Sequence, residues 1–85
     1  MASSRVPATA IRYHVGRLHV GTPDSEIQAD IRTRCREAGA TDAETDEAIQ
    51  VALDAHHENL ATFISVDRAV SMSAARKIVA ARAKS

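Results

Sequence analysis

The sequence predicts a mainly α-helical domain that begins with a short β-strand or hairpin, in the order strand-helix-helix plus a C-terminal helix. Three observations lead to this prediction. Leu18 and Val20 alternate with polar residues, which is typical of a strand with one buried face. Pro23 is followed by acidic residues, as at the start of a helix. Gly39 separates two segments whose apolar residues recur at helical spacing.

The segment before the predicted strand also alternates, with Ile11, Tyr13 and Val15 on one side. If Gly16 and Arg17 form a two-residue turn with Gly first, the two segments pair as a hairpin within one chain. Alternatively, they form one longer strand with a bulge at Gly16. The sequence leaves both arrangements open.

Two helices are predicted after the strand. The first runs from about Pro23 to Ala38 and ends at a glycine. Its core stripe has spacings of 4, 4 and 3 residues and consists of Ile27, Ile31, Cys35 and Ala38. The second begins at the capping-box pattern from Thr41 to Glu44 or, alternatively, slightly later at Thr45-Asp46-Glu47. Its stripe has spacings of 4, 3, 4 and 3 residues and consists of Ile49, Leu53, His56, Leu60 and Phe63.

The end of the second helix is not fixed by the sequence, because residues 63–66 are rich in β-favouring side chains. A last helix is predicted from about Ser73 to Ala83. The chain is therefore divided into a flexible tail at 1–9, a strand/helix/helix core at 10–66 and a basic C-terminal helix at 67–85.

The composition favours a small homodimer. The chain has 85 residues, one Tyr, one Phe and no Trp, so its core is thin and oligomerisation is expected. No run of about 18 apolar residues is present, so we expect no membrane contact. A single cysteine and the absence of an apolar signal core fit a cytoplasmic protein, in the host cytoplasm if a phage encodes it.

The formal net charge is zero, but it is distributed unevenly. The first 20 residues hold three arginines and no acid, the next 40 hold ten acids against three arginines, and the last 25 hold one acid against five bases. A neutral total argues against strong nonspecific nucleic-acid binding, whereas basic ends still permit a local anion site.

The most conspicuous polar cluster consists of His56, His57 and Asn59. Adjacent histidines on a helix point about 100° apart, so they do not easily share one ion and no metal is expected. His56 lies on the apolar stripe and is interpreted as a hydrogen-bonded interface residue. Cys35 lies on a buried stripe, where a thiol behaves as a small apolar group. We therefore predict no catalytic residues, no cofactor and no enzymatic activity.

Over residues 17–56, the order strand, Pro-started helix, Gly and second helix resembles the ribbon-helix-helix family of DNA-binding proteins, which includes the Arc and methionine repressors. Residues 46–56, DEAIQVALDAH, resemble the family pattern in the second helix. The resemblance implies an obligate dimer whose paired strands lie in the major groove of double-stranded DNA. It also implies that the outward strand residues Arg17, His19 and Gly21 contact DNA, with Arg17 able to donate two hydrogen bonds to guanine.

The acidic residues are consistent with a second function, the binding of a protein partner. Carboxylates crowd the start of the second helix, where the family holds a DNA phosphate; they belong to Asp42, Glu44, Asp46 and Glu47. This pattern favours a non-enzymatic protein-interaction module, of phage or host-targeting type, that binds a protein partner through an acidic helical face. The Arg17–Asp30 stretch and residues 56–59 also look similar to small uncharacterised proteins of actinobacterial phages.

Overall fold

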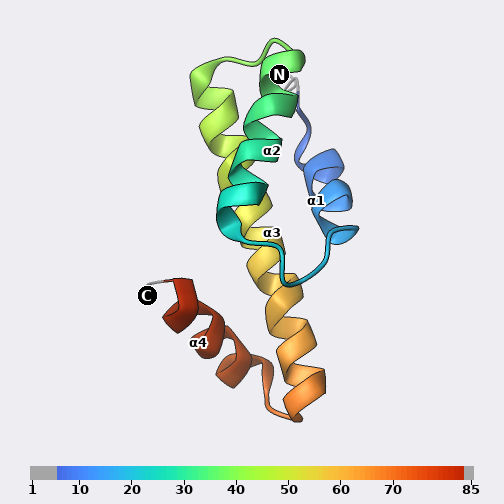
Figure 1. Ribbon diagram of the computed structural model, residues 1–85, viewed down its shortest axis with the longest axis vertical. Coiled ribbons are helices and arrows are strands. Elements are labelled where there is room, and N and C mark those ends of the chain that lie inside the picture. The colour runs from blue at the N-terminus through green and yellow to red at the C-terminus, as the bar shows by residue number, and fades with distance from the viewer. Residues whose placement is uncertain (1–5, 84–85) are drawn as a thin grey trace.

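The computed structural model describes residues 6–83, and this part of the chain contains four α-helices. The long helix α3 forms the centre, and each of the other three helices packs against it. Figure 1 shows α1 and α4 on opposite sides of α3, with α2 packed along its N-terminal half. The helices are α1 (Ala8–Gly16), α2 (Asp24–Glu37), α3 (Asp42–Arg68) and α4 (Met72–Ala83).

The predicted N-terminal strand or hairpin is wrong, because residues 6–83 contain no strand. The first alternating segment is helix α1, which buries Ile11 and Val15, one helical turn apart, and leaves Tyr13 70% exposed. A strand would have placed Tyr13 on the same face as the other two. The four-residue spacing of Ile11 and Val15 fits a strand and a helix equally well. The exposure of Tyr13 between them shows that the segment is helical.

The segment predicted as the second strand is an irregular connection between α1 and α2. The Leu18 amide donates to the Val15 carbonyl at 3.0 Å, and the Thr22 amide donates to the His19 carbonyl at 3.0 Å. Leu18 is half-buried and packs against the core, so the alternation reflects a loop that crosses the helices. Local turn hydrogen bonds take the place of a strand ladder here.

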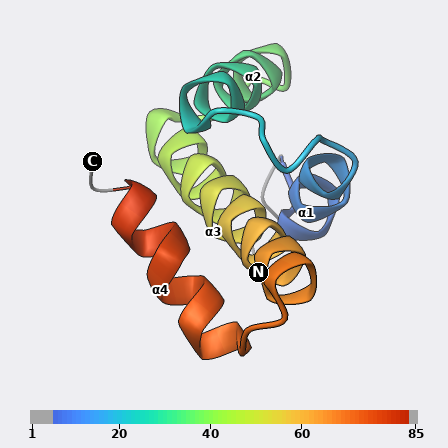
Figure 2. The same cartoon turned by 60° about the horizontal axis from the view of Figure 1, so that its bottom comes forward.

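Helix α2 agrees with its predicted range to within one residue at each end, and three of its four predicted core positions are buried. Ile27, Ile31 and Cys35 are at most 1% exposed, whereas Ala38 is exposed at the helix C-cap. Gly39 has a φ of 74°, which is the left-handed conformation expected of a glycine after a helix. The glycine turns the chain so that α3 runs back alongside α2 (Figure 2).

Helix α3 begins at the predicted capping box. The Thr41 hydroxyl accepts a hydrogen bond from the Glu44 amide at 3.1 Å, and the Thr41 amide donates to Glu44 Oε1 at 2.9 Å. The helix continues for 27 residues and so passes through the segment whose structure the sequence left open. The helix ends at Arg68, and its C-cap residue Ala69 has a φ of 54°. The hydroxyl of Ser65 donates to the carbonyl of Val70 at 2.6 Å across this turn.

Two separate apolar clusters hold the helices together. The larger joins α1, α2 and the N-terminal half of α3; its buried members are Ile11, Val15, Ile27, Ile31, Cys35, Ala48 and Ala52. The smaller joins the C-terminal half of α3 to α4; its buried members are Ala61, Ile64, Ala75 and Val79. The predicted boundary after residue 66 falls inside α3. Residues 1–5 of the predicted tail at 1–9 lie outside the described part of the chain.

Candidate interaction surface

One face of α3 is buried along its first half and exposed along its second. Ala48, Ala52 and His56 recur every four residues and are at most 3% exposed, because α1 and α2 cover them. At 100° per residue, the same face continues through Asn59, Phe63 and Val66. These three are exposed, Phe63 by 51% and Val66 by 79%.

This face of α3 becomes exposed beyond the C-terminus of α1 and the N-terminus of α2. The connection between these helices crosses α3 at His56, and beyond that point α4 is the helix beside α3 (Figure 1). Helix α4 covers a different side, on which Ala61 and Ile64 are buried. Among residues 6–83, no helix covers the stripe Asn59, Thr62, Phe63 and Val66, which we call the uncovered face.

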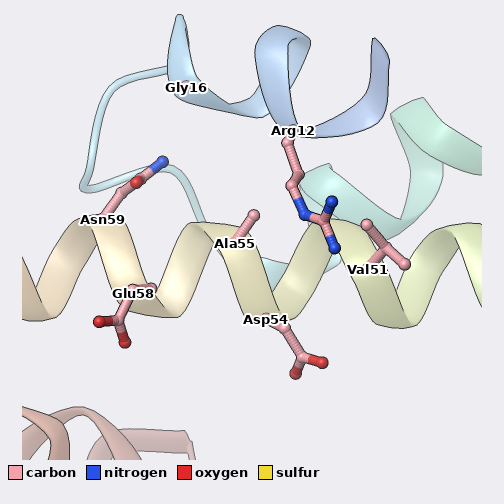
Figure 3. Close-up of a pocket in the computed structure, with 7 residues that line it drawn as sticks. All are labelled: Arg12, Gly16, Val51, Asp54, Ala55, Glu58 and Asn59. Atoms are coloured by element: carbon pink, nitrogen blue, oxygen red, sulfur yellow. The ribbon is translucent and has the colours of Figure 1, made fainter. Parts of the chain in front are cut away.

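A shallow groove adjoins the uncovered face between α1 and α3 (Figure 3). Its volume is about 440 Å³, and it is lined by Arg12, Gly16, Val51, Asp54, Ala55, Glu58 and Asn59. In Figure 3, Asn59 points towards the α1 side of α3, whereas Asp54 and Glu58 point away from α1. Asn59 therefore belongs both to this groove beside the C-terminal end of α1 and to the uncovered face.

The two carboxylates that line this groove are hydrogen-bonded to side chains outside it. Arg76 of α4 donates two hydrogen bonds to the Glu58 carboxylate, at 2.7 and 3.2 Å. These bonds lower the pKa of Glu58 and raise that of Arg76. Asp54 accepts a hydrogen bond from the Gln50 amide at 2.9 Å. The Glu58 carboxylate thus joins α3 to α4, whereas that of Asp54 is bonded within α3.

The predicted polar cluster does not form one exposed site, because its two histidines contact other parts of the chain and only Asn59 is exposed. His56 is 2% exposed, and its Nε2 lies 2.8 Å from the carbonyl oxygen of Thr22. His57 is half-buried, and its Nε2 lies 2.8 Å from a carboxylate oxygen of Asp24 at the start of α2. The two histidines hold the α1–α2 connection and the start of α2 against α3. Asn59 alone of the cluster is exposed.

The residues predicted to contact DNA lie at the end of α1 and in the connection after it. Arg17 is the C-cap of α1, and its guanidinium lies over the Tyr13 ring, 5.9 Å from the centroid. His19 accepts a hydrogen bond through Nδ1 from the Gly21 amide at 2.9 Å. All three predicted residues are exposed, but no strand carries them within the described chain.

A third histidine joins α1 to α2. The Nε2 of His14 lies 2.5 Å from Asp30 Oδ2, and Arg34 donates to Asp30 Oδ1 at 3.2 Å. Partial burial acts to raise the pKa of Asp30, but the hydrogen bond with His14 and the charge of Arg34 outweigh it. The pKa of Asp30 is therefore held below its ordinary value.

We compared this chain with family models, curated proteins and solved structures. None of them matches. The resemblance to the ribbon-helix-helix family therefore rests on the sequence pattern alone.

The described residues contain no group of three or more His, Cys, Asp or Glu side chains placed to hold a metal ion. None of the helices between residues 6 and 83 combines the length and apolarity needed to cross a bilayer.

The sequence interpretation placed Phe63 on a buried stripe and treated Val66 as part of a β-rich segment. The signal for an exposed apolar face was nevertheless present in the spacing. Ala52, His56, Asn59, Phe63 and Val66 are separated by 4, 3, 4 and 3 residues, which continues the buried stripe well past the helices available to cover it.

Proposed function

We propose that this protein is a non-enzymatic protein-interaction module that binds an apolar protein helix on the uncovered face of α3. The observation that carries the proposal is the continuation of the buried α3 stripe beyond α1 and α2, with Phe63 and Val66 left exposed. Large apolar side chains grouped on one surface mark sites of protein contact more often than isolated ones do.

The shape of the face favours a helical partner. Its four side chains are spaced three and four residues apart on one side of α3, which is the pattern that helix-on-helix contacts use. Asn59 and Thr62 border the apolar side chains with groups able to form hydrogen bonds at the edge of a contact. A flat helical stripe of this kind suits a packed helix better than a small molecule.

The predicted acidic face lies at the opposite end of α3. Glu44 takes part in the capping box, and Asp42 and Asp46 line a surface hollow together with Arg32 and Arg36 of α2. Nearby arginines reduce the local negative potential. The proposal therefore places the partner on the uncovered face, and binding through the acidic face stays a prediction.

DNA binding also stays a prediction of the sequence. The ribbon that would carry Arg17 and His19 into a major groove is missing from residues 6–83, so this route is not part of the proposal. Duplex DNA nevertheless belongs in the experiment as the competing ligand. Binding that falls steeply with salt and is lost in Arg17→Ala would contradict the proposal and support that prediction.

Site-specific photocross-linking tests the proposal directly. A benzophenone amino acid in place of Phe63 should form a covalent adduct with a protein in the cells that produce the chain. The adduct should disappear when Val66→Glu is added, because a charge then lies in the contact. The same amino acid in place of Lys77, an exposed residue of α4, should give no adduct. Equal labelling from both positions, or none from position 63, would refute the proposal.

A further inference from the structure

We propose that the partner on the uncovered face is a second copy of this chain, with its α3 packed antiparallel to the first about a two-fold axis near Phe63. The inference rests on the proposed function and names its partner. Three observations carry it: the small core of the α3–α4 hairpin, the symmetry of the uncovered face and the placement of charges at its two ends.

The first observation is the small core of the α3–α4 hairpin. The hairpin of α3 and α4 buries four apolar residues in its cluster, and two of them are alanines. So small a core leaves the C-terminal half of α3 short of apolar contacts. A helix added on the uncovered face would enclose this half of α3 from the side opposite α4.

The second observation is that the apolar stripe can pair with itself. A two-fold axis brings the same surface of both copies together, so a single compatible stripe is sufficient. With the axis near Phe63, the two phenylalanine rings meet at the centre and Val66 of each copy packs about 4.5 Å along the helix from it. The α3–α4 hairpins of two copies then form a four-helix arrangement.

The third observation is charge complementarity. Asn59 and Gly16 line the same groove, so the exposed Arg17 that follows Gly16 lies near the Asn59 end of the uncovered face. Asp67 is exposed, four residues or about 6 Å past Phe63 on the other side. In an antiparallel pair, Asp67 of the second copy lies opposite Asn59 and therefore beside Arg17. Symmetry makes this contact twice.

Sedimentation velocity over a concentration series tests the inference on the full chain. The wild type and Lys77→Glu should sediment as dimers at micromolar concentration, since both keep the uncovered face. Phe63→Glu and Val66→Glu should sediment as monomers with unchanged helical circular dichroism, because both side chains are more than half exposed within one copy. A dimer that persists in both glutamate variants overturns the inference.

Charge reversal tests the antiparallel arrangement separately. Arg17→Glu and Asp67→Arg should each weaken the dimer about tenfold, because each removes two symmetry-related ion pairs at the edge of the contact. The double variant should recover the wild-type dissociation constant, since the pairs then re-form with opposite sign. Weakening by the single variants with no recovery in the double variant overturns the proposed arrangement.

The two proposals fail in distinguishable ways. A chain that stays monomeric while the position-63 cross-linker captures a different protein overturns the second-copy inference and leaves the proposed function standing. A chain that stays monomeric and gives no adduct at position 63 overturns both.

Discussion

The buried imidazole of His56 and the main-chain carbonyl of Thr22 are joined by a 2.8 Å hydrogen bond across 34 residues of sequence. Because the carbonyl accepts, Nε2 carries the proton. The bond fixes the connection between α1 and α2 against the middle of α3. It also marks where the covered part of the α3 face ends and the uncovered face begins.

We expect His56→Leu to lower the free energy of unfolding by about 1–3 kcal/mol. Leucine fills most of the volume but leaves the Thr22 carbonyl without its donor. His57→Ala is the matched control: its hydrogen bond with Asp24 is partly exposed, at 30% and 41% of the two side chains, and should contribute less than about 1 kcal/mol. Urea unfolding midpoints measure both. Equal losses from the two variants would contradict the structural role assigned to His56.

Short-range sequence signals correctly predicted the end of α2 and the start of α3. The capping box at Thr41 and the glycine stop at Gly39 are present as expected, because both signals act within a few residues of sequence. The strand prediction failed because the four-residue spacing of Ile11 and Val15 fits one face of a strand as well as one face of a helix, and Tyr13 between them completed an apparent alternation. Only the packing of α1 on α3 separates the two.

The buried face of α3 was less predictable. The large residues Ile49 and Leu53 defined the predicted stripe, whereas the fully buried positions beside them are Ala48 and Ala52. Alanine carries little hydrophobic signal, yet its small side chain lets helices approach closely. A sequence pattern weighted by side-chain size therefore places the centre of the buried face one residue away. The uncovered face was missed for the same reason, because Phe63 seemed to belong to the core.

Thr41→Ala should cost about 1 kcal/mol of stability. The variant removes the side-chain acceptor of the Glu44 amide, which is one of the unpaired donors in the first turn of α3. Thr33→Ala is the control. Its hydroxyl donates to the Ala29 carbonyl on the exposed side of α2, so its loss should change stability by less than half as much. Chemical denaturation of the two variants in parallel provides the measurement. A larger effect at Thr33 would count against the capping role.

Ala69→Gly should stabilise the protein by about 0.5 kcal/mol. Ala69 has a φ of 54°, where a Cβ is strained, and its exposed methyl group contributes little packing. The gain is reduced by the greater freedom of glycine in the unfolded chain. Gly39→Ala is the reciprocal test: its φ of 74° should make that variant less stable by about 1 kcal/mol. Thermal unfolding midpoints should move in opposite directions. A shift of the same sign in both would show that backbone strain does not govern these turns.

The acid dependence of stability should contain a contribution from Asp30. Its pKa in the folded protein lies below the ordinary value of 3.8, so ionised Asp30 stabilises the fold above that pH. The contribution is lost as the pH falls through the folded-state pKa, when the carboxylate takes up a proton. Since the side chain is 38% exposed, solvent screening limits the effect to less than about 1 kcal/mol.

Asp30→Asn should therefore be less stable than the wild type near neutral pH, and the difference should shrink once the pH falls below about 3.8. Urea unfolding at a series of pH values measures the difference between the two proteins. Glu47→Gln removes an exposed carboxylate of α3 and serves as the charge-matched control, whose profile should follow that of the wild type. If Asp30→Asn instead runs parallel to the wild type down to pH 2, the bonds from His14 and Arg34 do not stabilise the ionised form of Asp30.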